Sequence, residues 1–205
     1  MSTENNTTNR KRSMRTLWIM VLLFGLPYVA AFYFYINRDT LAPEMATNYG
    51  TIITPARPIL EVPLTRIDNT IINSADLKGK WLLVSIGSSY CNRDCLDNLY
   101  KLRQIKKAVG QEHKRIRKIF FLKDTGNLVE FKKLLGDYRG MDVFLPEGKD
   151  YFHFLAGFHY QGGEVKDGVF IVDPLGNYMM MYPPGADAMK MLRDIERLLK
   201  VSRIG

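Results

Sequence analysis

The segment that decides the fold reads Trp81-Leu-Leu-Val-Ser-Ile-Gly-Ser-Ser-Tyr-Cys-Asn-Arg-Asp-Cys95. Its first residues, 81–86, are almost continuously apolar, which is typical of a buried strand. Two cysteines follow where this strand turns into a helix, and they are the only cysteines among 205 residues. Side chains four residues apart lie on one face of a helical turn, ~5–6 Å from each other. The spacing therefore permits either a disulfide or joint binding of one soft metal ion.

The surroundings of the two cysteines favour thiol chemistry. Unpaired N–H groups at a helix start favour a thiolate over a thiol; Arg93 acts in the same direction and Asp94 opposes it. The more exposed, helix-starting cysteine is normally the nucleophile, which predicts Cys91 as the attacking thiolate and Cys95 as its resolving partner. A purely structural disulfide is the weaker interpretation, because a bridge that closes so short a loop constrains the unfolded chain little.

The composition bounds the size and the partners of the protein. A chain of 205 residues with 46% hydrophobic content can bury one good core but hardly two. The net charge of +8 raises the question of nucleic-acid binding, but acidic residues are interleaved with the basic ones and no RNA-binding or helix-turn-helix signature is present. We therefore expect no nucleic-acid partner. A basic face toward anionic lipid or an acidic protein explains the charge better.

The N-terminal region predicts a membrane anchor. Residues 1–16 carry a basic cluster, and residues 17–36 then continue without a single charge. A helix of about twenty residues spans ~30 Å, the thickness of the bilayer core. A cleaved signal peptide explains the segment less well, because Ala30-Ala31 is followed by four large aromatic side chains, Phe-Tyr-Phe-Tyr. A buried soluble helix is also disfavoured, because such a helix is rarely apolar all round.

The basic flank predicts the orientation of this anchor. By the positive-inside rule, residues 1–16 form a basic tail in the cytoplasm and the rest of the chain faces outward. The expected location is the bacterial inner membrane with the C-terminal domain in the periplasm, and the mitochondrial inner membrane is the alternative. Two cysteines can be oxidised in such a compartment. Residues 37–62 are expected to form a proline-containing linker, and residues 63–205 to form the exported domain.

The exported domain is expected to alternate strands with helices. The patterns predict a short hairpin at 64–73, strands at 81–87, 116–122, 142–145, 168–173 and 177–182, and helices at 94–109, 128–135, 150–158 and 186–201. Such alternation indicates a partly parallel sheet with helices on both faces. Because the cysteine pair opens the first helix at the carboxyl end of the first core strand, we predict an α/β, thioredoxin-like fold with a mixed central sheet and flanking helices, preceded by one transmembrane helix.

The cysteine motif also resembles that of a known family. The residues from Leu77-Lys-Gly-Lys80 through Cys95, together with Asp173-Pro-Leu-Gly176, resemble the Sco/SenC family of cytochrome c oxidase assembly factors. That family has a membrane anchor, a thioredoxin-like domain and a C-x-x-x-C motif. The resemblance implies copper delivery to, or thiol reduction of, the CuA site of cytochrome c oxidase subunit II. The resemblance also implies that Cys91 and Cys95 correspond to the family's two motif cysteines and act as exchanging thiols or as Cu(I) ligands. The implied partner is subunit II or another copper-handling assembly factor.

The histidine that completes the family's copper site does not carry over. Where the family has Asp-His before a strand of the closing hairpin, this chain reads Lys166-Asp167-Gly168. His159, beside a Gly-Gly loop, is the better substitute metal ligand; His153, flanked by aromatic residues, is expected to be packed, and His113 is expected at the surface. Two thiolates alone suit Cu(I), whereas Cu(II) would need a nitrogen ligand as well. The missing histidine therefore favours dithiol–disulfide exchange over storage of Cu(II).

Three functions remain open from the sequence. The first is a membrane-anchored thioredoxin-like assembly factor that exchanges thiols, passes Cu(I), or does both. The second is a copper chaperone without turnover, in which the thiols are ligands only. The third is a scaffold that docks an oxidase subunit through its basic surface and uses no thiol chemistry. Only the first would make the protein an enzyme, a thiol–disulfide oxidoreductase.

Overall fold

The computed structural model describes residues 4–37, 48–159 and 167–204, and the chain divides into two units, Met1–Thr47 and Asn48–Gly205. The first unit contains helix α1, Glu4–Ile36. Its part Met14–Ile36 has a mean hydropathy of 2.0, so this helix is long and apolar enough to cross a membrane. The predicted span at 17–36 lies within it. The helix also extends backward through most of the predicted basic tail.

The second unit is built on a six-stranded mixed sheet with the order β1-β8-β7-β4-β5-β6. The strands β4, β5 and β6 are parallel, whereas β7, β8 and β1 each run antiparallel to their neighbours. Their bounds are β1 Thr51–Pro58, β4 Trp81–Gly87, β5 Ile116–Leu122, β6 Met141–Phe144, β7 Val169–Val172 and β8 Asn177–Tyr182. A separate two-stranded hairpin, β2 Pro63–Thr65 and β3 Ile71–Asn73, confirms the hairpin expected at 64–73.

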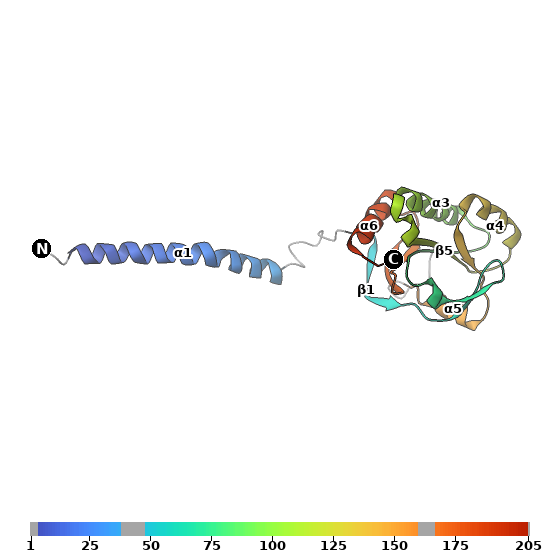
Figure 1. Cartoon of the computed structure of the whole chain (residues 1–205), viewed down its shortest axis with the longest axis horizontal. Coiled ribbons are helices and arrows are strands. Elements are labelled where there is room, and N and C mark those ends of the chain that lie inside the picture. The colour runs from blue at the N-terminus through green and yellow to red at the C-terminus, as the bar shows by residue number, and fades with distance from the viewer. Residues whose placement is uncertain (1–3, 38–47, 160–166, 205) are drawn as a thin grey trace. The chain divides into compact units, whose positions relative to one another are not determined.

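Helices cover both faces of the sheet, as the strand–helix alternation predicted (Figure 1). These helices are α3 Arg93–Ala108, α4 Leu128–Leu134, α5 Lys149–Ala156 and α6 Ala188–Val201, with short 3-10 turns at Ser74–Leu77, Gly110–Arg115 and Leu135–Tyr138. One face packs α5 against alternate residues of the central strands, including Val84, Phe121 and Phe170. The other face carries α3 and α6, with α4 beside the cysteine pair. The predicted α/β thioredoxin-like fold is confirmed.

The main departure from the sequence prediction is strand β1. The prolines of residues 37–62 predict a linker without long regular elements. Thr51–Pro58 nevertheless forms an eight-residue strand that pairs with β8. The prediction is wrong for these residues because β1 is an edge strand, where proline removes no hydrogen bond that a second neighbour would need. The register also shifts between Ile52 and Arg57, around Pro55, so the ladder is interrupted there.

Candidate thiol–disulfide site

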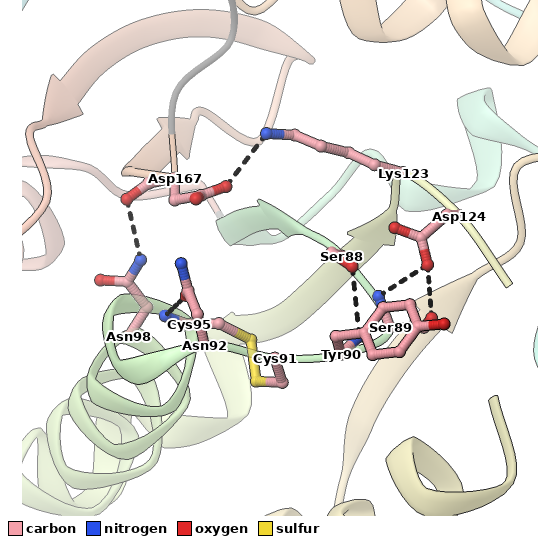
Figure 2. The surroundings of a disulfide bond; sticks show 10 residues. All are labelled: Ser88, Ser89, Tyr90, Cys91, Asn92, Cys95, Asn98, Lys123, Asp124 and Asp167. Carbon is pink, nitrogen blue, oxygen red and sulfur yellow. Dashed lines mark hydrogen bonds and ion pairs between the residues drawn. A yellow bond between two sulfur atoms is a disulfide. The ribbon is translucent and has the colours of Figure 1, made fainter. Parts of the chain in front are cut away.

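The two cysteines form a disulfide at the carboxyl end of β4 (Figure 2). Their Cα atoms lie 5.1 Å apart, within the normal range for a bridge. Cys91 lies in the loop that joins β4 to α3, and Cys95 lies in the first turn of α3. The sequence left a disulfide and a metal-bound pair both open, and the structure has the disulfide.

The sequence between the cysteines fixes the start of α3. The side-chain oxygen of Asn92 accepts a hydrogen bond from the backbone N–H of Cys95 at 2.9 Å, so Asn92 caps the helix. Cys91 has a φ of 39°, in the left-handed region that non-glycine residues seldom adopt. Its N–H donates to the carbonyl oxygen of Ser88 at 3.1 Å, which closes the turn that holds this conformation. The cap and the turn together place both sulfur atoms at the helix N-terminus.

The disulfide is mostly covered, and its two ends are covered unequally. Cys91 is 9% exposed and Cys95 is 3% exposed. Beneath them lies an apolar layer from the sheet, α3 and α4, made of Leu99, Phe120, Leu122, Phe131, Val143 and Leu145. Tyr90, directly before the pair, is largely exposed. The individual roles of the cysteines stay predictions, and this difference in exposure supports Cys91 as the residue that meets a partner.

A carboxylate that the sequence analysis did not single out holds the loop before Cys91. Asp124, just after β5, accepts a hydrogen bond from the backbone N–H of Ser89 at 3.2 Å and a short one from the Ser89 hydroxyl. Burial acts to raise the pKa of Asp124, but hydrogen bonds donated by Ser88, Ser89 and Gly126 outweigh it and hold that pKa below its usual value. Its position could have revealed it, because the carboxyl ends of neighbouring parallel strands meet at one edge of the sheet.

Asp167 lies near the two cysteines, in the segment where the Sco/SenC family has its copper-binding histidine. Its carboxylate forms an ion pair with Lys123, with Nζ and Oδ1 3.0 Å apart. Its carbonyl oxygen accepts a hydrogen bond at 3.2 Å from the amide of Asn98, which is buried on α3 one turn after Cys95. A carboxylate engaged with a lysine therefore lies near the cysteines, and this position supplies no imidazole.

The structure does not bring His159 to the cysteines. One ring nitrogen, Nδ1, lies 2.7 Å from the carbonyl oxygen of Ala156, and the other, Nε2, lies 2.7 Å from Nη1 of Arg57 on β1. His159 lines a groove of about 320 Å³ between β1 and α5 that no cysteine lines. Across residues 4–37, 48–159 and 167–204, no three His, Cys, Asp or Glu side chains gather as a metal-binding cluster.

The two remaining histidines also have defined places. His113 is exposed, as predicted. The expectation that His153 is packed is wrong: it is exposed on the outer face of α5. The buried face of this helix is made by Tyr151, Phe154 and Leu155, whose i, i+3, i+4 spacing leaves position 153 on the opposite side.

Comparisons with known proteins agree with this geometry. Among solved structures, yeast Sco1 shares 15% identity with a TM-score of 0.60, covering 71% of this chain and 99% of that chain. The copper-bound ScoI of Bradyrhizobium japonicum shares 14% identity with a TM-score of 0.55, covering 68% and 98%. A thiol:disulfide interchange protein of the thioredoxin family from Chlorobium tepidum shares 17% identity with a TM-score of 0.54, covering 72% and 99%. At these identities the likeness shows a common fold.

A comparison with curated proteins gave no match. The family model described as the transmembrane-like, thioredoxin-like, C-terminal domain matches residues 81–202, which is more than half of the chain. That range begins with the strand that leads to the cysteines and ends at the last helix of the domain. The chain therefore belongs to the transmembrane-like, thioredoxin-like family, with the disulfide site inside its C-terminal domain.

Proposed function

We propose that this protein is a membrane-anchored thiol–disulfide exchange factor that acts in cytochrome c oxidase assembly. The observation that carries the proposal is the Cys91–Cys95 bridge at the N-terminus of α3, where Cys91 is the less buried of the two cysteines, 9% exposed against 3% for Cys95. Backbone N–H groups and the positive end of a helix stabilise a thiolate at this place once the bridge is reduced. Both Sco proteins and a thiol:disulfide interchange protein share the fold that presents it.

The exchange would proceed in two displacement steps. The thiolate of Cys91 attacks one sulfur of a partner's disulfide, so a mixed disulfide forms and the partner's other sulfur leaves as a thiolate. The thiolate of Cys95 then attacks the Cys91 sulfur, which frees the second partner thiolate and leaves the bridge seen in the structure. Two electrons thus pass to the partner, and a separate dithiol donor must reduce the bridge before the next cycle.

The expected substrate is the cysteine pair of the CuA site in cytochrome c oxidase subunit II, which must be reduced before it can accept copper. The proposed location is the bacterial inner membrane, with the N-terminus in the cytoplasm and Asn48–Gly205 in the periplasm; the mitochondrial inner membrane is the alternative. The charge-free stretch of α1 and the basic residues before it support this placement.

Carriage of Cu(I) by the reduced pair is the second candidate function. The short separation of Cys91 and Cys95 would let two thiolates hold one Cu(I), which accepts two soft ligands. The described residues around the pair supply the ammonium of Lys123 and the carboxylate of Asp167 but no imidazole, so this donor set suits Cu(I) and not Cu(II). In this function Cu(I) is cargo that the two sulfur atoms bind and release.

Trapping of the mixed disulfide tests the proposed exchange. The full-length Cys95→Ser protein, in membranes, should accumulate a covalent adduct with a disulfide-bonded peptide that carries the cysteine pair of a CuA site. The matched Cys91→Ser protein should accumulate none, because it lacks the attacking thiolate. Equal trapping by both variants, or by neither, would contradict the proposed roles.

The other two functions give different results with the same proteins. A copper chaperone without turnover should bind one Cu(I) in the reduced wild type, lose it in either single variant, and form no adduct. A scaffold should support full oxidase activity in cells that carry the Cys91→Ser/Cys95→Ser double variant.

A further inference from the structure

A basic cleft lies at the end of the parallel strands opposite the disulfide. The parallel register pairs Trp81 with Ile116 at this amino end and Gly87 with Leu122 at the carboxyl end, from which the chain continues to the cysteines. The cleft has a volume of about 640 Å³ and is bordered by the end of α3, β5 and the turn after α4. Six basic side chains line it, against the single acidic residue Asp137: Arg103, Lys106, Lys107, His113, Lys118 and Arg139.

A buried lysine forms part of the wall of this cleft. Lys118 on β5 is 4% exposed, and its ammonium donates a hydrogen bond to the carbonyl oxygen of Arg139 at 2.9 Å. Among the described residues, no carboxylate lies within ion-pair distance of it. Burial, together with the charges of Lys106, Arg103 and Lys107, lowers the pKa of Lys118 to about 8. A buried cation without an anionic partner is costly, which indicates that an external anion completes the site.

Arg103 is held in a fixed orientation on the α3 side of the cleft. Its guanidinium carbon lies 5.5 Å from the ring centre of Tyr100 and 5.2 Å from that of Tyr138. Its Nη1 donates to the backbone carbonyl of Asp137 at 3.0 Å, so the carboxylate of Asp137 does not neutralise it through this contact. Its Nε is buried and makes no hydrogen bond within the part of the chain that the structure describes. The guanidinium is thus preorganised by its two ring contacts and its hydrogen bond to the backbone.

We propose that this basic cleft binds a phosphate group, carried either by a free phosphorylated small molecule or by the headgroup of an anionic phospholipid. A fixed guanidinium beside several ammonium groups matches the charge and the oxygen atoms of a phosphate group. The volume falls in the range of small-ligand sites. The cleft also includes the buried Lys118, and a small compact anion fits such a recess better than an extended acidic protein segment does. The site goes beyond the proposed exchange function and shares no residue with it.

Calorimetric titration of the full-length protein in a neutral detergent tests the proposal. The two probes are inorganic pyrophosphate and short-chain phosphatidylglycerol. The Lys107→Ala/Arg139→Ala variant changes two residues that line the cleft and are exposed, so it should fold normally. The control, Lys132→Ala/Lys149→Ala, removes the same charge from exposed positions elsewhere. We expect the cleft variant to bind about tenfold or more weakly, since each lost charged hydrogen bond is worth about that factor, and the control to change by less than about twofold.

Further measurements identify the source of the phosphate and the part played by Lys118. Tighter binding of phosphatidylglycerol indicates a lipid headgroup, and tighter binding of pyrophosphate indicates a free phosphate compound. Sulfate keeps its charge across neutral and alkaline pH, and it should bind more weakly at about pH 9 than at about pH 7, because Lys118 loses its proton in between. Equal loss of affinity in the control variant would overturn the proposal, and so would binding of a polyglutamate peptide without binding of either phosphate probe.

Discussion

The two ends of the parallel strands β4 and β5 differ in chemistry although the same helix, α3, borders both. At the carboxyl end, Cys91 and Cys95 rest on a layer of apolar side chains. At the amino end, Lys106 and Lys107 in the last turn of α3 join a cluster of cations around the buried Lys118. The helix dipole favours negative charge at its start and positive charge at its end. A thiolate site and a cation cluster therefore each occupy the end of α3 that suits them.

This comparison also shows why the two ends can serve separate tasks. The cysteine end presents a covalent, two-electron couple and keeps its sulfur atoms in mainly apolar surroundings. The basic end presents positive potential in a cleft and has no sulfur among its lining residues. Because no residue belongs to both sites, changes at one end should leave the activity of the other intact. The following predictions test that independence, beginning with the largest effect.

Removal of both thiols should abolish exchange and spare anion binding. The Cys91→Ser/Cys95→Ser protein cannot form a mixed disulfide or an internal bridge, so reduction of a disulfide-bonded peptide should fall to the uncatalysed rate. Its affinity for pyrophosphate should stay within about twofold of wild type, because neither cysteine lines the basic cleft. Both are measured on full-length protein in detergent. A loss of pyrophosphate binding in this variant would show that the two ends are coupled.

Truncation of the apolar layer under the disulfide should give the largest loss of stability. Phe131 on α4 is 1% exposed, and its ring centre lies 5.1 Å from that of Phe120. Phe131→Ala should lower the free energy of unfolding by about 3–5 kcal/mol, because it removes buried area and leaves a cavity. Chemical denaturation of the oxidised protein measures the change. Phe131→Leu is the matched control and should cost clearly less; equal costs for the two variants would show that the cavity does not determine the effect.

Removal of the carboxylate that holds the loop before Cys91 should have an intermediate effect that depends on pH. Asp124→Ala should cost about 1–3 kcal/mol at neutral pH, because the Ser89 donors lose their charged acceptor. The pKa of Asp124 is lower in the folded state than in the unfolded state, so its stabilisation is complete above about pH 4 and is lost as the pH falls through the folded-state value.

Denaturation curves at several pH values test this dependence. The difference between wild type and Asp124→Ala should shrink in acid, whereas the exposed Thr125→Ala protein should follow wild type throughout. A difference that stays constant with pH would show that the ionised carboxylate of Asp124 is not the source of the stability.

The smallest expected effect lies at the basic end. Lys118→Met should be at least as stable as wild type at about pH 7, because the substitution removes a buried ammonium and keeps a chain of similar shape. The pKa of Lys118 is about 8 in the folded protein and ordinarily 10.5, so the unfolded state binds more protons between these values. The contribution of Lys118 to wild-type stability should therefore rise as the pH increases from about 8 toward 10.5, and this contribution should be missing in the variant.

The free energy of unfolding as a function of pH measures this contribution. Lys107→Met changes an exposed lysine of the same cleft and should keep the alkaline rise. Burial also lowers the pKa of the neighbouring Lys106, so a smaller rise should remain in Lys118→Met. A rise in Lys118→Met as large as that of wild type, or the loss of the rise in Lys107→Met, would contradict the assignment to Lys118.

The local parts of the structure followed from the sequence. The strand predicted at 81–87 is Trp81–Gly87, and the helix predicted at 94–109 is Arg93–Ala108. The apolar segment predicted at 17–36 lies in a single helix. The close approach of Cys91 and Cys95 was also foreseeable from their spacing of four residues, although Cys91 lies in the loop before α3 and only Cys95 is on the helix. Periodicity and short spacing act within a few residues, and a sequence displays them directly.

The tertiary structure alone decided which distant residues meet. Strand β1 became an edge partner of β8 despite its prolines, and Asp124 reached Ser89, 35 residues earlier. His159 contacts Arg57, 102 residues away, and not the cysteines. These contacts depend on strand order, on register and on which helix covers each face, so they belong to the packing of the whole sheet. No local pattern carries that information, because a shift of one residue in register would exchange every partner.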